Sequence, residues 1–151
     1  MSSFDLIVDV STLTPGGAGP TTGVIWMQAG DTAFPEPGWR DFPEVILAWW
    51  LVELRQLLSG QAKAAVLRFM DGPFSCEVSH RDSNWQLTLV DRGIPPRPSR
   101  IVTASPQVVC SKVYKAAQLV AHAVVERGLV ARDSAALTVA LREFRVPVLG
   151  S

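Results

Sequence analysis

The stretch FPEPGWRDFPEVILAWWLVEL, residues 34–54, decides the first half of the fold, because a turn-rich loop in it runs directly into an apolar helix. Asp41 and Glu44 have the spacing of a helix capping box, so we expect Asp41 to be the N-cap. Apolar side chains then recur at helical spacing. They predict a helix over residues 42–59 that ends at Gly60.

Tryptophans are concentrated in the same stretch. Trp49 and Trp50 are adjacent and point about 100° apart on a helix, so one ring can enter the core while the other meets a second layer or the surface. We expect the core to hold both rings. Trp39 lies in the loop, where its ring either plugs the entrance of the helix or stands ready as an anchor for a partner.

The residues before this stretch predict strands. Alternation of apolar and polar side chains in residues 4–10 is typical of a half-buried strand. Residues 11–23 are rich in glycine and proline, which predicts a flexible connection. Residues 24–34 then have the pattern of a hairpin that turns at Gly30 and Asp31.

The chain after the first helix predicts a sheet. Three strand-like runs occupy residues 62–70, 74–80 and 85–91, and the short turns between them imply an antiparallel meander. A stiff proline-rich connector follows over residues 94–100. Residues 101–103 have the composition of a short returning strand.

Two further helices are expected near the C-terminal end. Ser105 and Pro106 have the pattern of an N-cap and first turn, and this helix should continue to a C-cap at Gly128. Alanine and valine occur nearly all round its second half, which predicts burial on most sides. Asp133 should cap a third helix that reaches about Phe144.

These elements together predict an α+β fold. We expect one domain over residues 1–151, because 48% hydrophobic against 19% charged side chains is ample for one core. The N-terminal hairpin strands and the meander should form an antiparallel sheet. Three helices should pack on it, most simply in a single layer on one face.

The sequence predicts a cytoplasmic protein that is not attached to a membrane. The N-terminus lacks the basic segment of a signal peptide and carries Asp5 and Asp9 where such a peptide is apolar. The longest intensely apolar run, residues 45–52, stops at Glu53 and is too short to span a bilayer.

Side chains that carry chemistry are sparse. Cys76 and Cys110 are far apart and are expected to be small buried hydrophobes, and the two histidines complete no metal-ligand set. His122 and Glu126 instead have the spacing of an ion pair on a helix surface, and a histidine satisfied within the core is the alternative. The spacing shows no nucleophile with its base and no pair of catalytic carboxylates. We therefore expect a protein that is not an enzyme and that holds no metal and no cofactor.

Charge is balanced overall but unevenly distributed. Residues 1–60 hold two basic and seven acidic side chains, whereas residues 61–151 hold twelve basic and seven acidic ones. Separation of this kind can steer a partner onto one face, and it can also vanish when the two halves pack together. The basic side chains near the proline-rich connector have few aromatic neighbours, and the isoelectric point is about 6.7, so nucleic acid is not an expected partner.

The segment GWRDFPEVILAWW, residues 38–50, carries a resemblance. It is similar to small bacterial proteins in which a G-W-x-D-F-P stretch runs into a helix with two adjacent tryptophans, followed by a strand meander. The likeness covers residues 34–92. Such proteins often resemble immunity proteins, the cytoplasmic antidotes of polymorphic or contact-delivered toxins. The resemblance implies a non-enzymatic inhibitor that plugs the active site of a cognate toxin, and it assigns no individual residue.

Protein binding is therefore the function that the sequence predicts. A tight complex needs a standard-sized interface with a few aromatic or arginine anchors. We expect the anchors to be Trp39, Trp85, Arg97 and Arg100, because all four fall in loops or at loop edges. The alternatives are a structural or scaffold subunit of a larger bacterial assembly, and a small-molecule-binding protein or enzyme whose site the sequence does not reveal.

Overall fold

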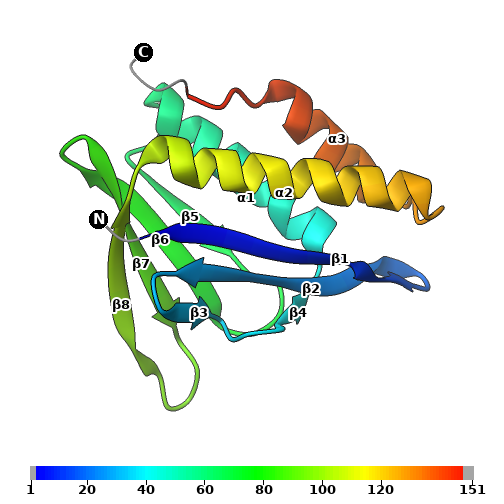
Figure 1. The fold of residues 1–151 in the computed structure, drawn as a ribbon, viewed down its shortest axis with the longest axis horizontal. Helices are drawn as coiled ribbons and strands as arrows, with labels where there is room; N and C mark the ends of the chain where they lie inside the picture. The colour runs from blue at the N-terminus through cyan, green and yellow to red at the C-terminus, as the bar shows by residue number, and fades with distance from the viewer. Residues whose placement is uncertain (1–2, 148–151) are drawn as a thin grey trace.

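A computed structural model describes residues 3–147 and confirms the α+β class, with three helices packed against antiparallel strands (Figure 1). The strands form two four-stranded sheets, whereas the sequence suggests one. Sheet A contains β1 (Phe4–Gly16), β2 (Gly19–Ala29), β3 (Thr32–Phe34) and β4 (Arg40–Asp41). Sheet B contains β5 (Ala64–Arg68), β6 (Phe74–Arg81), β7 (Asn84–Asp91) and β8 (Arg97–Ala104). The helices are α1 (Pro43–Ser59), α2 (Pro106–Glu126) and α3 (Ser134–Glu143).

The stretch rich in glycine and proline is part of a hairpin, so the prediction of a flexible connection is wrong. β1 and β2 pair as far as Gly16 and Gly19, although the register shifts after Asp9. The Thr12 hydroxyl accepts a hydrogen bond from the Val24 N–H at 2.8 Å and bridges the irregular part. Threonines favour extended backbone, and here they outweigh the glycines.

The other predicted strands are confirmed with changes of boundary. The second hairpin turns at Gly30, whose φ of 58° is a left-handed conformation that glycine adopts without strain. In sheet B each strand pairs with the next one along the chain, which is the predicted meander. The returning strand is longer than expected, because β8 begins at Arg97, within the proline-rich connector.

Helix α1 has the predicted extent but a different start. Its last turn closes at Gly60, whose φ is 81° and whose N–H donates to the Leu57 carbonyl. The N-cap is Phe42, which makes no side-chain capping hydrogen bond. The prediction that Asp41 caps this helix is therefore wrong: Asp41 lies in β4 and its carboxylate serves other donors.

The two C-terminal helices begin where the sequence predicts. Ser105 is the N-cap of α2, and its hydroxyl accepts a hydrogen bond from the Val108 N–H at 3.1 Å. Asp133 precedes α3 but makes no capping hydrogen bond. The prediction that α2 is buried on most sides is wrong, since Leu119 and Val125 are exposed. Alanine and valine tolerate exposure and therefore mark a buried face poorly.

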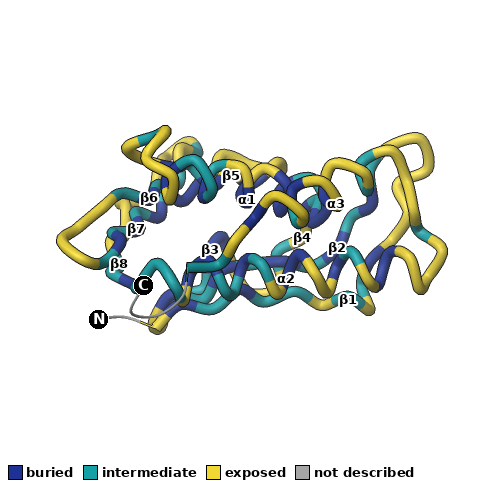
Figure 2. The backbone as a smooth tube through the Cα atoms, turned by 90° about the horizontal axis from the view of Figure 1, so that it is seen from above, coloured by how far each residue is buried: buried dark blue, intermediate teal, exposed yellow. Residues whose placement is uncertain are grey.

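The elements form two layers with the core between them. Seen from above in Figure 2, sheet B lies with α1 and α3 on one side, and sheet A lies with α2 on the other. The core combines side chains from both layers. Ile25 and Met27 of β2, Trp50 of α1, Leu87 of β7 and Val113 of α2 are all fully buried.

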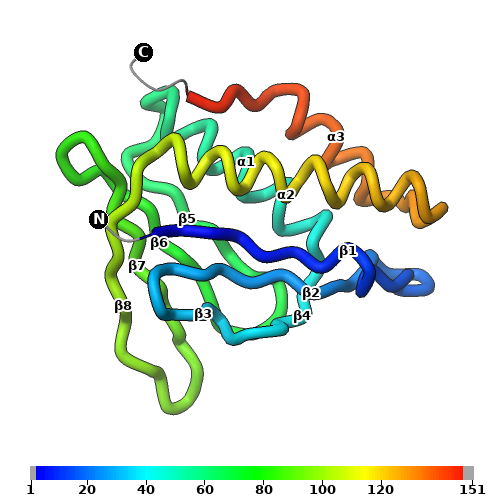
Figure 3. Tube along the Cα trace, in the orientation of Figure 1, coloured from blue at the N-terminus to red at the C-terminus, as the bar shows by residue number. Residues whose placement is uncertain are grey.

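Helices cover two of the sheet edges. α1 lies against the free edge of β5, where the Glu53 carboxylate accepts a hydrogen bond from the Val66 N–H at 2.8 Å. α2 lies beside β1, although the two are far apart in the sequence (Figure 3). There the Arg127 guanidinium donates to the Val10 carbonyl at 2.8 Å. Such cover matters because a bare edge offers unpaired backbone groups to other chains.

Candidate functional site

The loop before α1 is fastened by one buried carboxylate. Asp41 is 2% exposed and accepts four hydrogen bonds. Three come from backbone N–H groups, of Phe42 at 2.8 Å and of Met70 and Asp71 at 3.1 Å, and the fourth comes from the indole N–H of Trp39 at 3.0 Å. The carboxylate therefore joins the loop to the turn between β5 and β6. A buried carboxylate needs such donors, because burial without them is costly.

Trp39 closes the entrance of α1. Its ring is partly buried against the core and meets the Phe74 ring edge-on, with centroids 5.1 Å apart. Its indole N–H is occupied by Asp41. Of the two roles that the sequence leaves open, this geometry favours the plug. A contact between the exposed part of Trp39 and a partner stays a prediction.

Trp85 is buried, so the expected position at a loop edge is wrong. It is the second residue of β7, pairs with His80 and Ala104, and is 1% exposed. Strand alternation explains the burial, because Trp85 shares the inner face with Leu87 and Leu89. The ring belongs to the core and is not an anchor on the surface.

Two of the expected anchors, Arg97 and Arg100, line one groove. The groove lies between β3 and β8 and has a volume of about 370 Å³. Arg100 is exposed, and within residues 3–147 no carboxylate pairs with it. The residues that line the groove are Thr32, Ala33, Phe34, Asp91, Arg97, Pro98 and Arg100.

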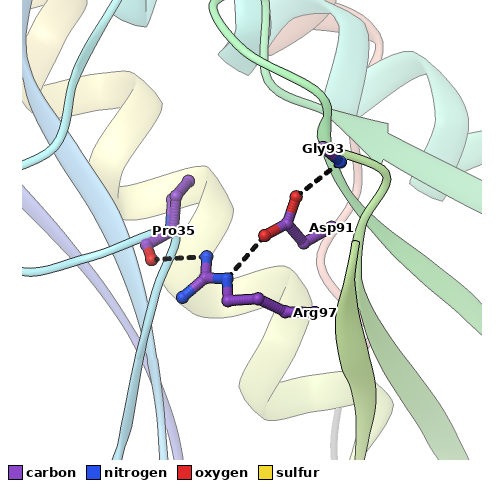
Figure 4. Close-up of polar contacts among 4 residues, drawn as sticks. All are labelled: Pro35, Asp91, Gly93 and Arg97. Atoms are coloured by element: carbon purple, nitrogen blue, oxygen red, sulfur yellow. Dashed lines mark hydrogen bonds and ion pairs between the residues drawn. The ribbon is translucent and has the colours of Figure 1, made fainter. Parts of the chain in front are cut away.

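Arg97 links the two sheets (Figure 4). Its Nε donates to Asp91 Oδ2 at 2.5 Å, its Nη2 donates to the Pro35 carbonyl at 3.4 Å, and its guanidinium lies 5.7 Å from the centre of the Phe74 ring. The Gly93 N–H donates to the other oxygen of Asp91 at 2.8 Å. The hydrogen bond from Arg97, supported by the one from Gly93, lowers the pKa of Asp91. These contacts of Arg97 hold the loop that follows β3 against sheet B.

A second exposed surface, which the sequence does not single out, surrounds Trp49. This ring is 44% exposed on α1, with one hollow of about 370 Å³ towards β5 and another of about 410 Å³ towards α3. The term Trp49 surface denotes the apolar side chains that line the two hollows, namely Ala48, Trp49, Val52, Val66, Ala135, Ala136, Val139 and Ala140. Charged side chains at its edge are Glu53, Arg68 and Glu143.

The two adjacent tryptophans divide between core and surface. Trp50 is fully buried, its indole N–H donates to the Arg68 carbonyl at 2.7 Å, and its ring meets Phe69 edge-on at 5.2 Å. The expectation that the core holds both rings is therefore wrong for Trp49. The sequence feature that could have indicated this division is that the two tryptophans are adjacent. Neighbouring side chains point about 100° apart on a helix, so only a wide buried face can hold both rings.

Both cysteines and His122 are placed as the sequence predicts. Cys76 and Cys110 are buried, and burial raises the pKa of each thiol to about 12. His122 and Glu126 form the expected ion pair on the surface of α2, with Nε2 and Oε2 2.9 Å apart. In the part of the chain that the structure describes, His, Cys, Asp and Glu side chains form no group of three or more that could hold a metal ion.

Glu44, in the first turn of α1, is buried beside the start of α3. It is 1% exposed, and neither carboxylate oxygen makes a hydrogen bond to another described residue. Burial raises the pKa of Glu44, the nearby Ser134 hydroxyl acts in the opposite direction, and the Asp133 carboxylate adds to the rise. Packing of α3 against α1 is thereby coupled to the protonation of this carboxyl group.

Helix α2 is long and apolar enough, by length and composition, to cross a membrane. In this structure 44% of the most apolar 18-residue stretch of α2 is buried inside the protein. Helices that fill the core of a protein have the same composition, so this feature alone identifies no membrane segment.

Comparisons with known proteins identify no relative of this chain. The chain matches no protein-family model, no curated protein and no solved structure. Two exposed places remain to be explained, the groove that holds Arg97 and Arg100 and the Trp49 surface.

Proposed function

We propose that this chain is a non-enzymatic immunity protein that neutralises a cognate bacterial toxin by binding it directly, without a metal or cofactor. The Trp49 surface is the observation that best supports this proposal. A tryptophan exposed between two apolar hollows and bordered by charged side chains has the composition of a binding hot spot. The resemblance of residues 34–92 to immunity proteins supports a toxin as the partner.

Covering Trp49 would contribute substantially to binding. A tryptophan side chain has up to about 250 Å² of surface, so a ring that is 44% exposed offers roughly 110 Å². At about 25 cal/mol per Å², its burial is worth about 2–3 kcal/mol. That corresponds to about a hundredfold in Kd.

The Trp49 surface is also held rigidly. It is carried by α1, α3 and β5, and α1 is fixed by the buried Trp50 on the side next to Trp49. Little conformational entropy is then lost when a partner binds, which favours a tight complex. An inhibitor that occludes an active site needs such a preorganised surface and no catalytic group of its own.

The experiment begins with a pull-down from the cells that make the protein, followed by mass spectrometry. The captured partner, expressed alone in a test host, should stop growth, and co-expression of this chain should restore it. Trp49→Glu should abolish the rescue while the variant remains folded at the growth temperature of the host, which its melting curve checks. Leu58→Glu is the matched control, because Leu58 is an exposed apolar residue of α1 outside the Trp49 surface.

Two results would overturn the proposal. A partner that is not toxic and that forms a stoichiometric assembly with this chain would support the scaffold alternative. Full rescue by Trp49→Glu would remove the Trp49 surface from the interface.

A further inference from the structure

The free edge of β8 differs from the other sheet edges of the described fold. α1 covers the edge of β5, α2 covers the edge of β1, and β3 and β4 are only three and two residues long. β8 has eight residues and pairs with β7 alone. No other helix or strand drawn in Figure 1 runs along its outer side. Within residues 3–147 the outward N–H and C=O groups of β8 have no backbone partner, and an edge of this kind can accept another strand.

The side chains of β8 indicate which strand this edge would accept. Arg100 pairs with Leu89 and Val102 pairs with Leu87, so both face the inner side of sheet B, and Arg100 also lines the groove with β3. Ile101 faces the outer side and is 59% exposed. An added strand would place one side chain beside Arg100 and the next one along beside Ile101. A carboxylate suits the first position, and an apolar side chain suits the second.

The charge around β8 favours an acidic partner over a second copy of the chain. Residues 92–104, which include all of β8, contain three arginines and no aspartate or glutamate. Arg92 and Arg97 have carboxylate partners, whereas Arg100 has none among the described residues. Pairing of β8 with another β8 would bring arginines together, and Pro98 offers no N–H. Both features oppose association of identical edges.

We propose that residues 99–103 of β8 dock an extended, acidic peptide segment of a partner protein, which joins sheet B as a fifth strand. The backbone of that segment pairs with the free edge, and one of its carboxylates pairs with Arg100. Its inward side chains cover the mouth of the groove beside Phe34. This docking site lies on other elements than the Trp49 surface and does not depend on the proposed immunity function.

The test uses the full chain and a short peptide of alternating glutamate and valine with blocked ends, followed by NMR. The peptide should shift the amide signals of residues 99–103 and slow their hydrogen exchange. A peptide with lysine in place of glutamate should bind at least about tenfold more weakly. N-methylation of two adjacent central residues should abolish binding, because neighbouring N–H groups in a strand point to opposite edges.

Charge reversal provides the second arm of the test. Arg100→Glu should weaken binding of the glutamate peptide by about tenfold and strengthen binding of the lysine peptide. Arg132→Glu, which reverses an exposed arginine between α2 and α3, should change neither. Equal binding of the N-methylated peptide, or unchanged affinity in Arg100→Glu, would overturn the proposal. So would a short oligothymidine that shifts the same amides more strongly than the glutamate peptide, since it would assign β8 to nucleic acid.

Discussion

Replacement of Asp41 by alanine separates a local role of this carboxylate from a tertiary one. The substitution leaves four donors without their acceptor, namely the indole N–H of Trp39 and the backbone N–H groups of Phe42, Met70 and Asp71. An orphaned buried donor costs about 1–3 kcal/mol, and water will reach some of these partly buried groups. We therefore expect Asp41→Ala to lower the free energy of unfolding by about 3–5 kcal/mol. A helix N-cap alone would account for about 1 kcal/mol.

Urea denaturation followed by tryptophan fluorescence measures this loss. With a slope near 2 kcal/mol per M, a loss of about 4 kcal/mol lowers the midpoint by about 2 M. Two control variants separate the contributions of the individual hydrogen bonds to this loss. Asp41→Asn keeps the shape and one carbonyl oxygen, so it should lose about half as much. Trp39→Phe removes only the indole donor and should cost about 1 kcal/mol.

A loss near 1 kcal/mol for Asp41→Ala, with an equal loss for Asp41→Asn, would contradict the tertiary role of this carboxylate. That outcome would mean that the carboxylate acts only at the start of α1. It would also mean that the contacts with Met70 and Asp71 contribute nothing to stability.

Three further substitutions have expected outcomes that denaturation measurements can check. Trp50→Ala should cost about 3–5 kcal/mol because the ring is fully buried, whereas Trp49→Ala should cost about half as much because 44% of that residue is exposed; equal losses would contradict the division between core and surface. Burial raises the pKa of Glu44 above its ordinary 4.5, so the unfolded chain releases this proton first and stability falls as pH rises through the interval between the two values. Glu44→Gln should therefore raise the melting temperature at pH 7 and leave it nearly unchanged below about pH 4. A variant that melts lower at both pH values would contradict this assignment.

Features set by neighbouring residues could be predicted from the sequence. The extent of α1 follows from the spacing of its apolar residues and from Gly60, and the start of α2 follows from Ser105. The role of Asp41 could not be predicted in this way. Its choice between capping α1 and binding other donors depends on Met70 and Asp71, about thirty residues further along the chain.

The candidate site was harder to predict than the fold for the same reason. Trp85 follows a turn, and only the covering of the inner face of sheet B makes it a core residue. Trp49 lies in an apolar helix, and only the positions of β5 and α3 leave it exposed. Arg97 and Arg100 were expected in a connector, but as residues of β8 they share one groove. Exposure is a property of the assembled layers and is not encoded in local composition.

The position of α2 beside β1 has a consequence for the order of events on the ribosome. β1 ends at Gly16 and α2 begins at Pro106, so 106 − 16 = 90 residues of translation separate the strand from the helix that covers its edge. At a synthesis rate of about 5–20 residues per second, this interval lasts roughly 5–20 s. During that time the nascent chain presents the edge of β1 uncovered, at the stage when an incomplete sheet is most prone to pair with another chain. Sheet A can therefore reach its final state only after α2 has been made, and a chaperone that holds the N-terminal hairpin would raise the yield of folded protein.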